Sequence, residues 1–175
     1  EIIYYGIDFS HFKVSDFKKI NQGEEMKTKH IPALAGRFNE YLQPERASKH
    51  LEKQVIGDYH SVQFLIKDIN PDNIVLGSKF ILTNDSISEI IKNYKLKETT
   101  GIGLVQIPES FNKAERYVTS FSVFFDIQSR EVLYSIKAKG LPGSKWGFTD
   151  YLYNGLIETY SIFIGYYKKE MKTFK

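Results

Sequence analysis

The sequence predicts an α+β fold in which helices cover a mixed, mostly antiparallel sheet. Two patterns in the second half of the chain carry this prediction. Apolar and polar residues alternate from Tyr117 to Ile127 and again from Val132 to Ala138, as in strands with one buried face. Apolar residues then recur at helical spacing from Phe148 to Met171. Because a sheet with one apolar face needs a cover, we expect this long C-terminal helix to pack on it.

The 175 residues are interpreted as a single domain, 1–175. Hydrophobic residues make up 42% and charged residues 26%, which is the balance of a chain that buries a core. The sequence contains no internal repeat, low-complexity tract or linker that would divide it.

The first half of the chain predicts one buried strand followed by short helices. Residues 2–9 are β-branched and aromatic, as in a buried strand, and the polar stretch 10–29 has room for one short helix. Apolar spacing predicts helices at 31–42 and 62–69, and the stretch from Pro44 to Ile56 could form another short helix. The turn sequence 70–73 ends the last of these.

A further helix is predicted from the capping-box spacing of Ser86 and Glu89, followed by an apolar stripe to Tyr94. Residues 102–111 read as a strand, and Pro108 indicates an edge or a bulge there. Together with the two alternating segments, this strand predicts a C-terminal β-meander with short connections.

The charge pattern argues against nucleic-acid binding. The formal net charge is +3, and 20 lysines stand against 4 arginines, although bidentate phosphate and base contacts favour arginine.

The segment 148–167 is long enough to span a membrane, but Asp150, Asn154 and Glu158 interrupt it. We therefore interpret it as an amphipathic cover helix and expect no transmembrane segment.

The absence of cysteine excludes a thiol nucleophile, a disulfide framework and a thiolate metal site. The chain begins with Glu1 rather than Met. We interpret this as a missing upstream segment, either a signal peptide, with a lipid anchor as a further option, or a trimmed start.

The glycine-rich stretch 140–147 is the most informative in the chain. It offers glycines, a lysine and a following helix, as phosphate loops do. Its spacing matches neither G-x-x-x-x-G-K-[ST] nor G-x-G-x-x-G. We favour a tight strand-to-helix connection capped by Thr149 or Asp150. A small-molecule site remains the alternative, and its candidate residues would be Lys145, Trp146, Asp126 and Asp150.

Catalytic and metal signatures are weak, so no catalytic residue, metal or cofactor is assigned. Burial of Asp126 among aromatic neighbours would raise its pKa and suit it to acid–base work, but the strand alternation places it opposite the core face, near the hairpin turn. The pairs Asp8/His11 and Asp58/His60 could ligate a metal, but such pairs arise readily by chance, and we interpret them as surface or internally satisfied polar residues. The acidic repeat 68–72 lacks the glycine and glutamate of a calcium loop and reads as a turn.

Three motifs that begin between Gly101 and Tyr151 carry a resemblance to a family. They are GIGLVQIPESFNKAE, SVFFDIQSREVLYSIKAKG and GFTDYLYNG. The segment resembles small secreted or lipoprotein-like α/β proteins of Bacteroidetes, which carry no known activity. Thr149-Asp150 stands where that family pattern has Arg-Asn, and Leu152 stands where it has Trp. The resemblance implies an α/β fold and export to the periplasm or cell surface.

These observations favour a non-enzymatic binding module of the cell envelope, with an unknown protein or surface polymer as its partner. The alternative is a small-molecule-binding protein or enzyme with its site near the 140–150 loop. A deep pocket with convergent polar groups would favour that alternative, and a broad exposed aromatic patch would favour the first reading.

Overall fold

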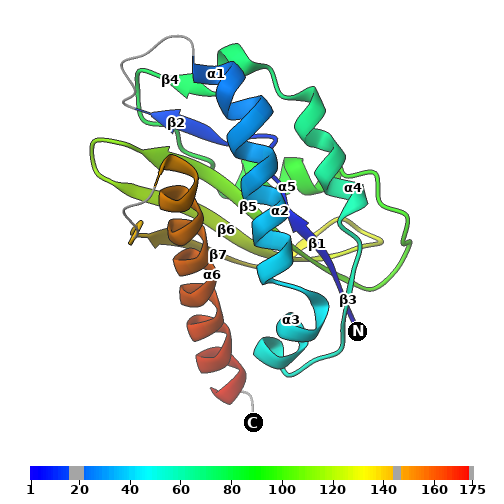
Figure 1. Cartoon of the computed structure of the whole chain (residues 1–175). Coiled ribbons are helices and arrows are strands. Elements are labelled where there is room, and N and C mark those ends of the chain that lie inside the picture. The colour runs from blue at the N-terminus through cyan, green and yellow to red at the C-terminus, as the bar shows by residue number, and fades with distance from the viewer. Residues whose placement is uncertain (16–21, 144–146, 174–175) are drawn as a thin grey trace.

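A computed structural model describes residues 1–15, 22–143 and 147–173. Lys145 and Trp146 lie outside the described residues. The chain forms one seven-stranded sheet with helices on both faces (Figure 1). Its strands are β1 (Ile2–Ile7), β2 (Lys13–Ser15), β3 (Val55–Gly57), β4 (Val75–Leu76), β5 (Ile102–Asn112), β6 (Tyr117–Asp126) and β7 (Val132–Gly140).

The predicted fold class was wrong. Five strands, in the order β3-β1-β5-β2-β4, pair in parallel. The other two are added by antiparallel ladders, β6 beside β5 and β7 beside β6. The protein is therefore a mixed α/β fold rather than an α+β fold with a mostly antiparallel sheet. The parallel strands β2, β3 and β4 contain two or three residues each. Such short segments are too brief for alternation to reveal them.

The helical elements fill the connections between these strands. They are α1 (Gln22–Glu25), η1 (Met26–His30), α2 (Ile31–Tyr41), α3 (Pro44–Leu51), α4 (His60–Gln63), η2 (Phe64–Asp68), η3 (Pro71–Asn73), α5 (Asn84–Lys92) and α6 (Phe148–Thr173). α5 begins earlier than predicted because Thr83, not Ser86, is its N-cap. The Thr83 side chain accepts from the Ser86 amide, and the Ser86 side chain reaches back.

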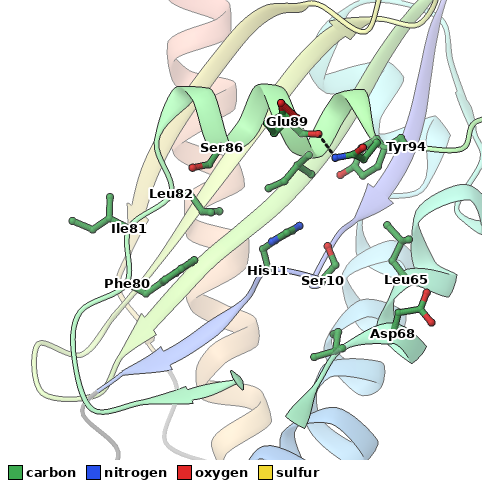
Figure 2. Close-up of a pocket in the computed structure, with 13 residues that line it drawn as sticks. Ser10, His11, Leu65, Asp68, Phe80, Ile81, Leu82, Ser86, Glu89 and Tyr94 are labelled. Atoms are coloured by element: carbon green, nitrogen blue, oxygen red, sulfur yellow. Dashed lines mark hydrogen bonds between the residues drawn. The ribbon is translucent and has the colours of Figure 1, made fainter. Parts of the chain in front are cut away.

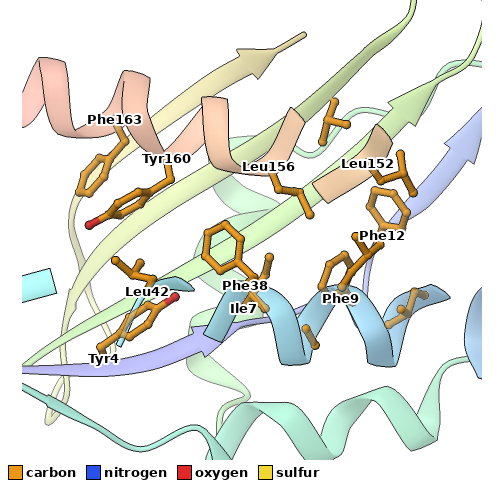
Figure 3. Packing of buried hydrophobic residues seen from close by; sticks show 14 of the residues in the cluster. Tyr4, Ile7, Phe9, Phe12, Phe38, Leu42, Leu152, Leu156, Tyr160 and Phe163 are labelled. Carbon is orange, nitrogen blue, oxygen red and sulfur yellow. The ribbon is translucent and has the colours of Figure 1, made fainter. Parts of the chain in front are cut away.

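Two cores lie on opposite faces of the sheet. α2 and α6 cover one face, where Phe38, Leu156 and Phe163 pack against the strands (Figure 3). α4 and α5 cover the other face, where Tyr5 meets Phe125 and the apolar side of α5. Leu156 and Phe163 are fully buried, and Phe163 contacts Phe124 of β6, so the predicted cover helix is confirmed.

β1 and β2 form one interrupted strand along the same edge of β5. Ile7 pairs with Gln106 and Lys13 pairs with Ser110. The chain therefore advances six residues from β1 to β2 while β5 advances only four. The excess length leaves the sheet as a loop at 8–12. This interruption positions the site described next.

No described helix is both long and apolar enough to cross a membrane.

Candidate functional site

Asp126 lies at the hairpin turn, as the strand alternation predicts, and not in a buried aromatic environment. It ends β6, and its Oδ1 accepts the Ser129 amide at 2.7 Å in the β6–β7 turn. That backbone hydrogen bond holds the pKa of Asp126 below its ordinary value, whereas burial would have raised it. Its role in the structure is to shape a turn.

Asp150 lies in the first turn of α6 and ties that helix to α2. Its Oδ1 is 2.6 Å from Nη1 of Arg37, whose guanidinium also stacks 4.2 Å from the Tyr153 ring centroid. Next to it, the Thr149 hydroxyl is 2.8 Å from Nδ1 of His30. These side chains dock the start of α6 rather than presenting an open site.

The structure does not bring Asp126 and Asp150 together. Val118 pairs with Gly140 at the loop end of β6, and Asp126 is eight residues further along the same strand. Eight residues of strand span about 26 Å. Asp126 and the 140–150 loop therefore lie at opposite ends of β6 and do not form one site.

The two aspartate–histidine pairs follow the carboxyl ends of neighbouring parallel strands. Asp8 follows β1 and accepts from the Ser10 amide at 2.8 Å and the Tyr94 hydroxyl at 2.6 Å. Asp58 follows β3 and accepts from the His60 amide at 3.1 Å and the Ser61 hydroxyl. Both carboxylates are thus internally satisfied. Among the described residues no group of three or more histidine or acidic side chains could hold a metal ion.

A cavity of about 620 Å³ opens where the β1–β2 strand is interrupted (Figure 2). In open α/β sheets, ligands bind outside the carboxyl ends of parallel strands, and this cavity lies beyond the end of β1. Figure 2 shows α5 on one side, η2 on another and the 80–82 segment closing a third. Its lining residues are Ser10, His11, Leu65, Asp68, Ile69, Phe80, Ile81, Leu82, Ser86, Glu89, Ile90, Asn93 and Tyr94.

The loop at 8–12 builds the floor of this cavity by sending its residues to opposite faces. Phe9 and Phe12 are buried in the core beneath α2 and α6, where their rings meet edge to face at 5.5 Å. The residues between them, Ser10 and His11, line the cavity beneath α5. The two phenylalanines therefore anchor the polar pair in place.

The wall at Leu82 is held by a buried carboxylate of β5. Oε1 of Glu109 accepts the Leu82 amide at 2.6 Å, and Oε2 accepts the Thr119 hydroxyl at 2.6 Å. This fixes an otherwise strand-free segment against the sheet, so Phe80 and Leu82 present a defined apolar surface to the cavity.

The titratable groups of the cavity differ in their environments. Burial lowers the pKa of His11, although nearby Asp8 opposes the shift, so the imidazole is neutral at neutral pH. Burial, followed by the charge of Asp8, raises the pKa of Tyr94 well above its ordinary range. At neutral pH the cavity thus contains a neutral histidine and a protonated tyrosine, with the carboxylates of Asp68 and Glu89 also lining it.

No protein-family model, curated protein or solved structure proved significantly similar to the chain. The resemblance of residues 101–151 to Bacteroidetes proteins is therefore untested.

Sequence reasoning missed this cavity as a site. The Asp8/His11 spacing was the only signal, and it pointed to a metal rather than to a loop floor. The sequence predicts the apolar face of α5, but Glu89 was interpreted as part of a capping box and Asn93 belongs to no binding motif.

Proposed function

We propose that the protein is a non-enzymatic binding module whose cavity beneath α5 takes a small ligand with an apolar body and a cationic end. The observation that carries this proposal is the contrast within the cavity lining. The lining is mostly apolar, with Leu65, Ile69, Phe80, Leu82 and Ile90 in it. Its acidic residues are Asp68 and Glu89, and no lysine or arginine is among the described lining residues.

The size of the cavity suits a drug-sized molecule, since ligand pockets commonly measure about 300–1,000 Å³. The Phe80 ring lines the cavity and adds aromatic surface, with the ammonium group of Lys13 5.7 Å from its centroid. Glu89 on α5 and Asp68 on η2 then favour a positive group, because His11 adds no charge at neutral pH.

The alternative location near the 140–150 loop has less support. Asp150 is already paired with Arg37, and Asp126 lies at the far end of β6. The cell envelope as the place of action is also part of the proposal, and it is supported only by the resemblance of residues 101–151.

Binding of three indoles with the same aromatic body tests the proposal. Tryptamine carries a positive charge, indole-3-acetate a negative charge and 3-methylindole none. We expect calorimetry to rank their affinities in the order tryptamine, 3-methylindole, indole-3-acetate. Binding of none of them, or an equal affinity for the acetate, contradicts the proposal.

A matched pair of variants on α5 then tests the position of the ligand. Glu89→Gln removes a carboxylate of the cavity, whereas Asp85→Asn removes one from the same helix outside it. Loss of a charged hydrogen bond lowers affinity about 10- to 100-fold. We expect that loss for Glu89→Gln alone, and an equal effect of both variants would place the ligand elsewhere.

A further inference from the structure

β7 has an outer edge that no described strand covers. Within the described residues β7 pairs only with β6, so alternate backbone N–H and C=O groups of β7 face outward without a strand partner. Figure 1 shows β7 at the border of the sheet, next to α6. An open edge of nine residues is a template for pairing with another strand.

The lysines of β7 do not protect this edge. Lys137 Nζ lies 2.6 Å from Glu109 Oε1 and 5.2 Å from the Phe121 ring centroid. Lys139 Nζ lies 3.6 Å from the centroid of Tyr117. Both ammonium groups are therefore drawn back over the face of β6 and β5, whereas edge-protecting lysines project outward. β7 also contains no proline.

Apolar side chains border both ends of β7. Leu133 and Leu141 are 55% and 59% exposed, among the most exposed large hydrophobic residues described. These two side chains lie at opposite ends of the unpaired strand and add apolar surface there.

One row of α6 continues this apolar border. Glu158 accepts the amide of Leu141 at the end of β7, and Glu170 lies beside the Tyr134 phenol near its start. Ile162 and Tyr166 occupy the same i, i+4 row between those glutamates, so they lie alongside β7. Tyr166 is 52% exposed.

We propose that β7 pairs antiparallel with β7 of a second copy of this chain, giving a two-fold dimer with one continuous sheet. Full overlap of the nine-residue strand centres the pairing on Ile136. Because opposite residues of an antiparallel pair share a face, Ile136 then meets Ile136 and Tyr134 meets Ala138 of the second copy.

The charges of β7 suit this self-pairing. In that register Lys137 lies opposite Ser135, and Lys139 lies opposite Leu133, the extra residue at the bulge of β7, so no lysine faces another. A shift of two residues toward the end of the strand would place Lys137 opposite Lys137, which repulsion disfavours. The strand is thus complementary to itself in this register, as a two-fold interface requires.

The position of α6 is compatible with the same dimer. A methyl group on Gly155 would lie 2.8 Å from Val118 of β6, and one on Gly140 of β7 would lie 2.0 Å from the Gly155 carbonyl oxygen. α6 therefore lies over the β6–β7 pair at this point. With strands about 4.8 Å apart, the two copies of α6 would run about 10 Å apart, the normal distance of packed helices. Tyr166 and Ile162 would then contribute to the interface.

Sedimentation velocity from about 1 μM to 1 mM protein tests the proposal. We expect a concentration-dependent dimer, and a monomer throughout this range overturns it. Leu133→Asp should raise the dimer dissociation constant at least about tenfold. Ile81→Asp is the matched control, because Ile81 is 57% exposed but lies at the α5 cavity. Equal effects of the two variants overturn the proposal.

Hydrogen exchange identifies the surface independently of any variant. The outward amides of β7 should exchange more slowly at high than at low protein concentration, while β6 amides, already paired on both sides, should not change. A dimer that protects another surface and leaves β7 unchanged also overturns the proposal.

Discussion

Two glycines on α6 provide a sharp test of how that helix is seated, because the same substitution has opposite expected effects. Gly165 has no atom within 4 Å of the position a Cβ would take, so Gly165→Ala only removes the helix penalty of glycine. We expect a gain of about 1 kcal/mol in the free energy of unfolding. A Cβ on Gly155 would instead lie 2.8 Å from Val118 Cγ2. Overpacking of this kind costs about 1–3 kcal/mol.

The net expectation for Gly155→Ala is a loss of up to about 2 kcal/mol, after subtracting the gain in helix propensity. Gly140→Ala should cost more, about 3 kcal/mol or above, because its Cβ would lie 2.0 Å from a backbone carbonyl that cannot rotate away. Urea unfolding followed by circular dichroism measures all three variants. If Gly140→Ala has the same free energy of unfolding as the wild-type protein, the close contact of α6 with β7 is refuted.

Two further predictions concern the floor of the α5 cavity. Tyr94→Phe removes the hydroxyl that donates to the buried Asp8 carboxylate and should cost about 1.5–3 kcal/mol in urea unfolding; a loss below about 0.5 kcal/mol would mean that the bond contributes little. Burial lowers the pKa of His11, so below the unfolded value of about 6.5 the unfolded chain binds more protons and stability falls as pH drops. His11→Asn should weaken that fall between about pH 7 and 5, and an NMR titration placing the His11 pKa above 6.5 would contradict the reasoning.

The long elements of this fold could be predicted from the sequence because their periodicity repeats several times. The alternation from Tyr117 to Ile127 locates β6, and the helical stripe after Phe148 locates α6. The parallel arrangement could not be predicted in this way. It depends on strands such as Val55–Gly57 and Val75–Leu76, which are too short to show a period. Their pairing with β1 and β2 is set by tertiary contacts.

The candidate site was harder to predict for a related reason. Residues 2–9 read as one continuous strand, yet β1 ends at Ile7 and the chain leaves the sheet. Phe9 looks like a further strand residue, and Phe12 lies in the polar stretch interpreted as a short helix. In the structure both are anchors in the core under α2 and α6. The cavity exists only once α5 and η2 pack over the resulting loop.

One buried carboxylate connects the two surfaces for which we propose functions. Glu109 holds the Leu82 amide at the wall of the α5 cavity and, through the same oxygen, the ammonium group of Lys137 on β7. Because Glu109 is almost completely buried, it requires these donors, and Lys137 is held over the sheet face as a result. A lysine on an edge strand would ordinarily be interpreted as protection against strand pairing. Here its charge is already committed to Glu109, which is why the edge of β7 remains open to a second strand.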